Sequence, residues 1–278
     1  MKLLRFGQKG AERPGLVDAA GTIRDLSAYV EDIDAAVLDD ASLARLAAID
    51  PASLPAVDPA TARAPGLPRA GFLSAMGIIS AANAAEAGMR VPAEPVVFTK
   101  APSCLNGPND DVVLPRGSEK SDWEVELAVV IGKRAVDVSE DEAFDHVAGY
   151  CICNDVSERA FQIERGGQWV KGKSAPTFGP LGPWLVTRDE IADPQSLAMF
   201  LDVNGERMQT GTTATMVFAV RTLVSYLSRF MALEPGDVIT TGTPPGVGMG
   251  KKPQRFLTSG DVMHLGIEGL GEQTQRVV

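Results

Sequence analysis

The chain has few of the side chains from which many enzymes build their active sites. It contains only two histidines, His146 and His264, and only three cysteines, at positions 104, 151 and 153. A Ser-His-Asp hydrolase and a histidine-rich zinc enzyme are therefore hard to build from this sequence. An odd number of cysteines without framework spacing also argues against a disulfide scaffold, so we expect three free thiols that serve in packing.

The chain also lacks long apolar runs and an excess of positive charge. No window approaches about 18 uninterrupted apolar residues, and the N-terminal stretch, MKLLRFGQKG, has no apolar region of the signal-peptide kind. The net charge of −10 argues against a nucleic-acid partner and against an anionic membrane surface. We therefore expect a cytoplasmic protein with neither of these partners, long enough to bury a sizeable core.

The chain divides into two regions that differ in their sequence pattern. Short apolar runs between residues 2 and 26 predict strands, and the helical spacing of apolar residues over 33–49 predicts a helix. The prolines that follow indicate an extended connector, so we predict a small N-terminal domain over 1–68 and a second domain over 69–278. In the second domain, the longest amphipathic stretch covers 212–233, and its apolar stripe, which ends at Phe230, predicts a face packed on the core.

An acidic strand organises the second region. Residues 122–132 alternate in such a way that Glu124 and Glu126 point to the same face of the predicted strand. Two carboxylates about 4 Å apart repel by roughly 4 kcal/mol at an effective dielectric near 20, so a positive group has to neutralise them. A hard divalent cation, magnesium or calcium, does this through oxygen ligands. The alternative is an edge strand whose acidic face is solvated.

Five motifs follow one another in order. They are DWEVEL at 122–127, NDVSERAFQ at 154–162, GKS at 172–174, TFGPLGPW at 177–184 and PGDVITTGTPPGVG at 235–248. Together they resemble the fumarylacetoacetate hydrolase superfamily, and most closely its subgroup that hydrolyses 2,4-diketo-3-deoxy sugar acids derived from L-fucose or L-rhamnose. The resemblance implies an α+β, β-rich fold with a mixed β-roll catalytic domain of the C-terminal type of this family and a small N-terminal α/β domain. It also implies a homodimer.

The resemblance assigns metal ligands and a lysine. The metal ligands of the family match Glu124, Glu126 and Asp155, which implies one Mg²⁺ or Mn²⁺ per active site with positions left for water and substrate. Lys173 matches the lysine beside the substrate. From the residues alone, Lys173 is equally compatible with a surface position.

The resemblance also implies residues that contact a 2-oxo acid substrate. Thr243, with the Gly242 backbone, matches the turn that holds the carboxylate of a pyruvoyl group, and Arg159 and Gln162 match positions that face the rest of the substrate. The turn could also be an ordinary loop. Arg159 could instead form an ion pair with a neighbouring glutamate, at position 158 or 164.

The implied reaction is hydrolysis of a 2,4-diketo acid to pyruvate and a carboxylic acid. The substrate would chelate the metal, which serves as a Lewis acid and a template. Water would attack the C4 carbonyl, the C3–C4 bond would break, and the metal and Lys173 would hold the leaving enolate of pyruvate. No redox cofactor is required.

One segment departs from the family pattern. The family carries a segment of the form G-L-N-Y-x-x-H-A-x-E, and here the matching residues, 77–86, read GIISAANAAE. Asn83 therefore stands in place of the histidine that activates water with the glutamate, while Ser80 replaces an aromatic substrate-side residue and Glu86 is retained. Pro176 likewise replaces an aspartate of a later motif.

Three functional hypotheses follow from this departure. An asparagine can orient a water but cannot take its proton, and a general base typically contributes about 10²–10⁴-fold. The first hypothesis is a hydrolase in which Glu86 works alone as the base and Asn83 positions the water. The second is a tautomerase or decarboxylase of oxaloacetate-like 2-oxo acids, and the third is a non-catalytic protein that binds metal and 2-oxo acids.

Overall fold

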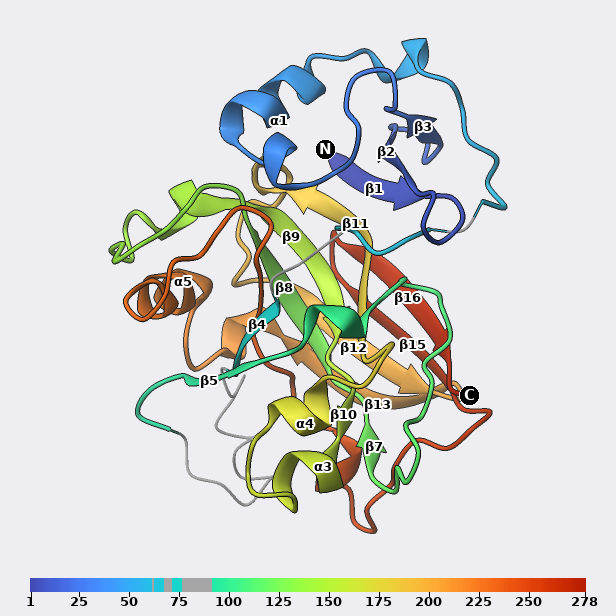
Figure 1. Ribbon diagram of the computed structural model, residues 1–278, viewed down its shortest axis with the longest axis vertical. Helices are drawn as coiled ribbons and strands as arrows, with labels where there is room; N and C mark the ends of the chain where they lie inside the picture. The colour runs from blue at the N-terminus through green and yellow to red at the C-terminus, as the bar shows by residue number, and fades with distance from the viewer. Residues whose placement is uncertain (62, 68–71, 77–91) are drawn as a thin grey trace.

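The computed structural model describes residues 1–61, 63–67, 72–76 and 92–278, which form mostly β-sheet with few helices (Figure 1). The largest sheet has the strand order β3-β2-β1-β11-β9-β8-β14-β4-β5, with β6 beside β11. Its strands are β1 (Lys2–Phe6), β2 (Arg13–Val17), β3 (Ile23–Asp25), β4 (Phe72–Met76), β5 (Val96–Thr99), β6 (Leu105–Asn106), β8 (Val125–Ile131), β9 (Val147–Asn154), β11 (Gly179–Thr187) and β14 (Val238–Thr240).

Two smaller sheets complete the strands. One has four strands in the order β13-β12-β15-β16, and the other has two, β10 and β7. The strands are β7 (Ser121–Asp122), β10 (Ser157–Glu158), β12 (Ala198–Val203), β13 (Glu206–Thr212), β15 (Val262–Ile267) and β16 (Gly271–Arg276).

The helices are short. The α-helices of the described residues are α1 (Asp40–Ala47), α3 (Arg159–Ile163), α4 (Val170–Lys173) and α5 (Val220–Ser228). The 3₁₀ turns are η1 (Ala35–Val37), η2 (Pro51–Ser53), η3 (Pro102–Cys104), η4 (Ala143–His146), η5 (Arg188–Glu190), η6 (Thr213–Thr215) and η7 (Gly248–Gly250).

Strand β8 lies in the middle of the core. All seven of its residues are buried, because β9 and β14 pair with its two edges and side chains cover both faces. Glu124 and Glu126 are only 5% and 2% exposed. The alternative of a solvated acidic edge strand is therefore wrong, and the two carboxyl groups need partners inside the protein.

Buried amide side chains connect the four-stranded sheet to the largest one. Asn154 Nδ2 at the end of β9 donates to Gln275 Oε1 over 3.0 Å, and Gln273 Nε2 donates to the Ile152 carbonyl over 2.9 Å. Gln209 Oε1 on β13 accepts from the N–H of Val125, the first residue of β8. We call Asn154, Gln209, Gln273 and Gln275 the amide seam; each of its four side chains is at most 1% exposed.

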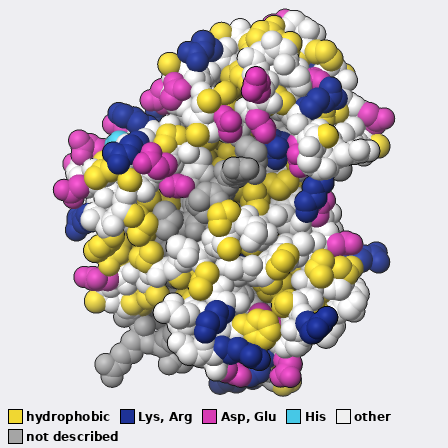
Figure 2. All heavy atoms as spheres, viewed as in Figure 1, with side chains coloured by type: hydrophobic (Ala, Val, Ile, Leu, Met, Phe, Trp, Pro, Cys, Tyr) yellow, Lys and Arg dark blue, Asp and Glu magenta, His cyan; other side chains and the backbone are white. Residues whose placement is uncertain are grey.

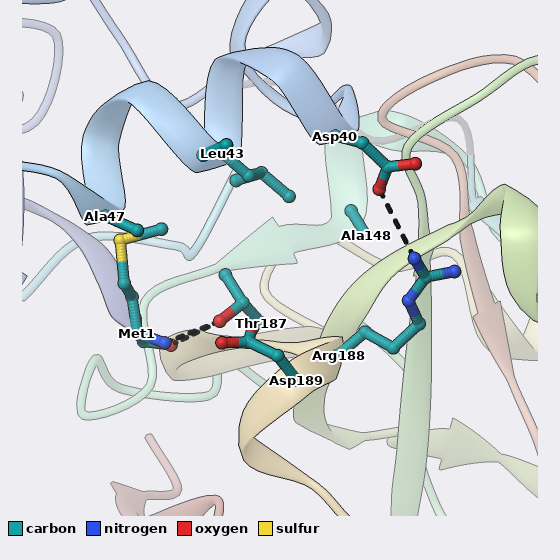
Figure 3. A pocket seen from close by; sticks show the side chains of 9 residues that line it. Met1, Asp40, Leu43, Ala47, Ala148, Thr187, Arg188 and Asp189 are labelled. Carbon is teal, nitrogen blue, oxygen red and sulfur yellow. Dashed lines mark hydrogen bonds and ion pairs between the residues drawn. The ribbon is translucent and has the colours of Figure 1, made fainter.

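The N-terminal strands extend the largest sheet. Strand β1 pairs antiparallel with β11, with Lys2 opposite Val186. The N-terminal ammonium also donates to Thr187 Oγ1 over 2.5 Å, beside a cavity of about 240 Å³ between α1 and the end of β11 (Figure 3). Residues 1–6 are thus joined to the rest of the protein by a strand ladder, and a domain boundary at residue 68 stays a prediction.

The helix predicted over residues 33–49 forms as two shorter elements, η1 and α1. Asp34 accepts a hydrogen bond from the Ala36 N–H, and Asp39 accepts one from the Ser42 N–H, so each aspartate caps a separate helix start. The backbone of Asp39 is extended. The prediction of one continuous helix is therefore wrong, because apolar spacing does not reveal a capping residue in mid-pattern.

The amphipathic stretch over 212–233 forms an α-helix only over α5, after the short 3₁₀ turn η6. Val220, Leu223 and Leu227 are fully buried, as the stripe predicted. Phe230 lies beyond the helix end and is 63% exposed, so its prediction as a core residue is wrong. Figure 2 shows apolar side chains over the region of this face where Figure 1 places α5.

The cysteines fulfil the expectation of free thiols. Cys104, Cys151 and Cys153 are unpaired and buried. In the described part of the chain, no helix is both long enough and apolar enough to cross a membrane.

Candidate metal centre

Three carboxyl groups meet where the start of β8 lies beside the end of β9. The strands pair antiparallel with Val125 opposite Asn154, which places Glu124 and Glu126 next to Asp155. One oxygen of each carboxyl group lies within 4.8 Å of the other two. The structure therefore brings together the three residues predicted as metal ligands, and we call them the triad.

Two lysines neutralise part of the triad. Lys173 Nζ at the end of α4 donates to Glu124 Oε2 and to Asp155 Oδ2, each over 2.7 Å. Lys100 Nζ, just after β5, donates to Asp155 Oδ1 over 2.7 Å and also contacts the Lys173 carbonyl. Both ammonium groups are buried, so the alternative of a surface position for Lys173 is wrong.

The pKa values of two triad members shift in opposite directions. Burial raises the pKa of Asp155, but the ammonium groups of Lys100 and Lys173 lower it by more than burial raises it. The pKa of Asp155 therefore lies below its usual value. Burial, together with the charges of Asp155 and Glu124, raises the pKa of Glu126 well above its usual range, and Lys173 only partly opposes this. Among the described residues, Glu126 is thus the member of the triad that has no ion-pair partner.

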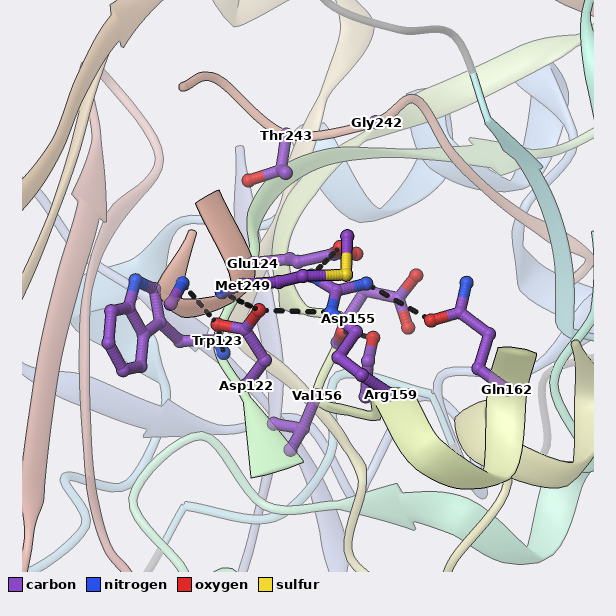
Figure 4. Close-up of polar contacts among 12 residues, drawn as sticks. Asp122, Trp123, Glu124, Asp155, Val156, Arg159, Gln162, Gly242, Thr243 and Met249 are labelled. Atoms are coloured by element: carbon purple, nitrogen blue, oxygen red, sulfur yellow. Dashed lines mark hydrogen bonds and ion pairs between the residues drawn. The ribbon is translucent and has the colours of Figure 1, made fainter. Parts of the chain in front are cut away.

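Arg159 at the start of α3 forms a clamp on Glu124. Its Nη2 donates to Glu124 Oε1 over 2.6 Å, its Nε donates to Asp122 Oδ2 over 2.9 Å, and its Nη1 donates to Gln162 Oε1 over 3.2 Å (Figure 4). Burial lowers the pKa of Arg159, but the two carboxylates raise it by more than burial lowers it, so the guanidinium stays charged. The alternative of an ion pair with the glutamate at 158 or 164 is wrong.

Asp122 connects this clamp to the loop after β14. It is fully buried, and its Oδ1 accepts from the Gly248 N–H over 2.6 Å while its Oδ2 accepts from the Met249 N–H over 3.0 Å. The loop and the metal-ligand strand are therefore held at a fixed separation.

The turn at Gly242 and Thr243 runs alongside the same strand. The Gly242 N–H donates to Glu126 Oε2 over 2.8 Å, and Thr243 Oγ1 donates to the Val125 carbonyl over 2.9 Å. Figure 4 shows this turn on one side of the carboxyl groups and Arg159 with Gln162 on the other. The predicted substrate-binding residues that the structure describes therefore surround the triad.

The residues present fit a hard divalent cation. Lys100, Lys173 and Arg159 form ion pairs with three carboxyl groups, those of Asp122, Glu124 and Asp155. The fourth carboxyl group, that of Glu126, accepts a hydrogen bond from the Gly242 N–H. Carboxylate oxygens are the ligands that Mg²⁺ and Mn²⁺ prefer. A cation shared by the triad would supply the counter-charge that Glu126 lacks.

Ser80, Asn83 and Glu86 lie outside the described residues, so their predicted roles remain predictions from the sequence. The two histidines lie elsewhere: His146 Nδ1 contacts the Lys133 carbonyl, and His264 Nε2 lies 2.8 Å from Glu272 Oε2 on the four-stranded sheet. Neither histidine contacts the triad.

Three residues of this cluster were not predicted as site residues. Asp122 opens the DWEVEL motif, so its place was visible although its role was not. Lys100 directly follows β5, and a lysine just after an apolar strand is a weak signal for a buried ion pair. Gln209 carries no signal, because it comes from a different sheet and only the packing of the two sheets brings it to the triad.

Comparison with known proteins agrees with this architecture. The family model for the fumarylacetoacetate (FAA) hydrolase C-terminal region matches residues 75–278. A protein of Burkholderia cenocepacia (strain HI2424), whose name calls it a presumed hydrolase, is 61% identical over 277 residues, which is 99% of this chain and 98% of the relative.

Solved structures of related enzymes share the whole fold. A fumarylacetoacetate hydrolase from psychrophilic Exiguobacterium antarcticum is 36% identical with a TM-score of 0.86, and the match covers 100% of this chain and 99% of the other. A maleylpyruvate hydrolase from Sphingobium sp. SYK-6, in complex with manganese(II) and pyruvate, is 28% identical with a TM-score of 0.82 and the same coverage.

Isomerases also share this fold. A 5-carboxymethyl-2-hydroxymuconate delta-isomerase from Mycobacterium smegmatis is 30% identical with a TM-score of 0.79, and the match covers 100% of this chain and 98% of the other. Structural similarity therefore extends to both hydrolases and isomerases. The family model covers most of the chain and the curated relative covers nearly all of it, so this chain belongs to the fumarylacetoacetate hydrolase family.

Proposed function

We propose that this protein is a divalent-metal-dependent hydrolase that cleaves the C3–C4 bond of a 2,4-diketo acid to give pyruvate and a carboxylic acid. The observation that carries the proposal is the buried triad with the Lys173 ammonium held against two of its members. The manganese and pyruvate in the maleylpyruvate hydrolase of Sphingobium sp. SYK-6 support both the metal class, Mg²⁺ or Mn²⁺, and the product.

In this proposal the triad binds one cation, which when bound supplies a Lewis acid for the 2-oxo acid group. The described contacts use two of the three N–H groups of Lys173. The third can donate to the oxygen on which negative charge develops as pyruvate leaves as its enolate. Because Lys173 is buried, its charge acts there with little screening by water.

The remaining roles are proposed from the sequence. Glu86 acts as the general base, with Asn83 orienting the water, and the proton from that water is finally delivered to C3 of the leaving enolate. The turn at Gly242 and Thr243 binds the substrate carboxylate, while Arg159 and Gln162, with Ser80, face the acyl tail. That tail is the polyhydroxylated chain of a 2,4-diketo-3-deoxy sugar acid.

We also propose a cytoplasmic homodimer. Apolar side chains remain exposed at one edge of the largest sheet, where Val96 and Val97 on β5 are 36% and 37% exposed. Light scattering on the purified protein tests the assembly, and a monomer at micromolar concentration would contradict it.

A second candidate is tautomerisation or decarboxylation of an oxaloacetate-like 2-oxo acid. The similarity to the delta-isomerase from Mycobacterium smegmatis favours it. This chemistry needs stabilisation of an enolate but no hydrolytic water, so it does not require a base that activates water.

The test is to incubate the Mn²⁺-loaded protein with synthetic 2,4-diketo-3-deoxy sugar acids and acylpyruvates and to quantify pyruvate. Glu124→Gln removes a ligand charge and should abolish pyruvate release, and Glu86→Gln should lower it about 10²–10⁴-fold. Glu119→Gln, an exposed acid near the same strand, is the matched control and should keep full activity. No pyruvate from any diketo acid would overturn the proposal, and carbon dioxide released from oxaloacetate would favour the second candidate.

A further inference from the structure

Gln209 on β13 is a fully buried amide that reaches the metal-ligand strand from another sheet. Its Oε1 accepts a hydrogen bond from the Val125 N–H over 3.1 Å, and its Nε2 donates to Thr243 Oγ1 over 2.8 Å and to the Pro244 carbonyl over 2.7 Å. The side chain therefore contacts both the residue between the two glutamates of the triad and the turn that runs alongside them.

The orientation of this amide is fixed by its partners. The Val125 N–H can only donate, so the atom facing it has to be the amide oxygen. The Pro244 carbonyl can only accept, so the atom facing it has to be the amide nitrogen. A flipped amide would lose both contacts, so these partners are satisfied by only one of the two orientations of the Gln209 amide group.

Thr243 closes a cycle of hydrogen bonds with Gln209 and Val125. Its hydroxyl accepts from Gln209 Nε2 and donates its one proton to the Val125 carbonyl over 2.9 Å. Both the N–H and the C=O of Val125 are thus hydrogen-bonded within this cycle. Because Glu124 and Glu126 flank Val125, the direction of this residue's backbone sets the directions in which their carboxyl groups project.

The neighbouring N–H group is held by the same kind of partner. The Glu124 N–H donates to Asn154 Oδ1 over 3.2 Å, and Asn154 is held in turn by Gln275 from the four-stranded sheet. Two successive backbone N–H groups of the metal-ligand segment therefore bond to buried amide side chains and not to a neighbouring strand.

We propose that Gln209 is a positioning residue of the metal centre: by closing the cycle with Thr243 and Val125, it fixes the triad glutamates and the 242–244 turn relative to each other. Gln209 does not contact the triad oxygens or the reacting atoms, so it acts only through Val125 and Thr243. This inference deepens the proposed function and rests on it for the consequence in metal binding, while the cycle itself can be tested without metal.

The first test measures amide hydrogen exchange of Val125 in metal-free protein for wild type, Gln209→Met, Thr243→Val and the double variant. If the three residues form one cycle, each single change should speed exchange of this amide by at least about tenfold, and the double variant should exchange no faster than Gln209→Met. If Thr243→Val leaves the exchange rate within about twofold of wild type, the cycle is refuted.

The second test measures Mn²⁺ affinity by calorimetry. Loss of an outer partner of a metal ligand typically weakens binding about 10–100-fold, so Gln209→Met should raise the Kd at least about tenfold. Gln195→Met is the matched control, because Gln195 also accepts from one backbone N–H, that of Val220, and donates to one carbonyl, that of Thr213, away from the triad. It should leave the Mn²⁺ Kd unchanged.

The outcomes separate this inference from the proposed function. If Gln209→Met loses thermal stability as Gln195→Met does, yet binds Mn²⁺ within about twofold of wild type, Gln209 is merely structural and the positioning role is overturned. If wild type itself binds no Mn²⁺, the proposed function fails and the positioning role in a metal centre fails with it, while the exchange data still decide whether the cycle exists. KM for the diketo acid should rise more than kcat falls in Gln209→Met, because the turn that the cycle holds is the proposed site of the substrate carboxylate.

Discussion

Replacing Lys173 with methionine perturbs the charge balance of the triad most directly. Methionine keeps most of the side-chain length but removes the ammonium that lies 2.7 Å from both Glu124 and Asp155. The triad oxygens lie within 4.8 Å of one another, and two charges at that separation interact by about 3.5 kcal/mol at an effective dielectric near 20. Three ionised carboxylates on their own would therefore repel by roughly 10 kcal/mol, which is comparable to the whole stability of a typical protein. In the variant, Lys100 beside Asp155 and Arg159 beside Glu124 still offset part of this repulsion.

The metal-free variant can avoid most of this repulsion by taking up a proton. Glu126 is the group that does so, because burial and the neighbouring carboxylates already raise its pKa and Lys173 is the group that opposes this. The cost should then fall to the roughly 3–5 kcal/mol typical of a broken buried ion pair. It should be larger at pH 8 than at pH 6, because protonating Glu126 becomes harder as the pH rises.

Urea denaturation at pH 6 and pH 8, with EDTA and with Mn²⁺, measures this cost. Lys171→Met is the matched control: Lys171 lies on the same helix, is exposed, and its ammonium donates to the Arg165 carbonyl, so the change should alter stability by less than about 0.5 kcal/mol. Mn²⁺ should narrow the gap between Lys173→Met and wild type, because a divalent cation restores the missing positive charge. Equal stability of the two variants in EDTA at pH 8 would refute the electrostatic reasoning.

Three further predictions follow from the buried groups. In metal-free wild type the raised pKa of Glu126 means that the native state holds a proton that the unfolded chain releases above about pH 4.3, so stability should fall as the pH rises from about 5 toward neutrality. Glu126→Gln should flatten that slope in urea titrations, and an unchanged slope would assign it to another group. Asp155, whose pKa is lowered, makes stability depend on pH only below about pH 4, where its stabilising effect is lost as the pH falls. Lys100→Met should cost about 3–5 kcal/mol in thermal unfolding, since it removes a buried partner of Asp155, and a loss under about 1 kcal/mol would contradict this. Burial raises the pKa of the Cys151 thiol, so a thiol reagent at pH 8 should modify it only at the rate of unfolding, and rapid labelling of the native protein would show an open path to it.

Much of the metal centre follows from the sequence because its ligands come from two neighbouring strands. Glu124 and Glu126 are two residues apart on one strand, and the motif that contains Asp155 directly follows another. The alternation of a strand and the pairing of β8 with β9 are then sufficient to bring the three carboxyl groups together. The role of Lys173 followed only from the resemblance, since a lysine in the short motif GKS has no local feature that indicates burial.

The remaining features depend on contacts between distant segments. Lys100 reaches Asp155, and Gln209 reaches Val125, only because the strands β5 and β13 fold against the metal-ligand strand. Local rules failed differently at Asp39 and Phe230: a capping side chain divided one predicted helix, and the end of α5 left the last apolar residue of the stripe in solvent. In both cases the helix ended or was interrupted at one residue, and the spacing of apolar residues did not predict where.

The amide seam gives the two sheets a connection that does not depend on protonation. Amide side chains do not titrate, so the hydrogen bonds of Asn154, Gln209, Gln273 and Gln275 keep their strength in mildly acidic buffer. In the metal site proposed above, the triad would lose its affinity for a cation as its carboxylates take up protons. Brief acidification should then release a bound cation, and neutral buffer with a chosen metal should reload the site, while the hydrogen bonds of the seam hold the two sheets together.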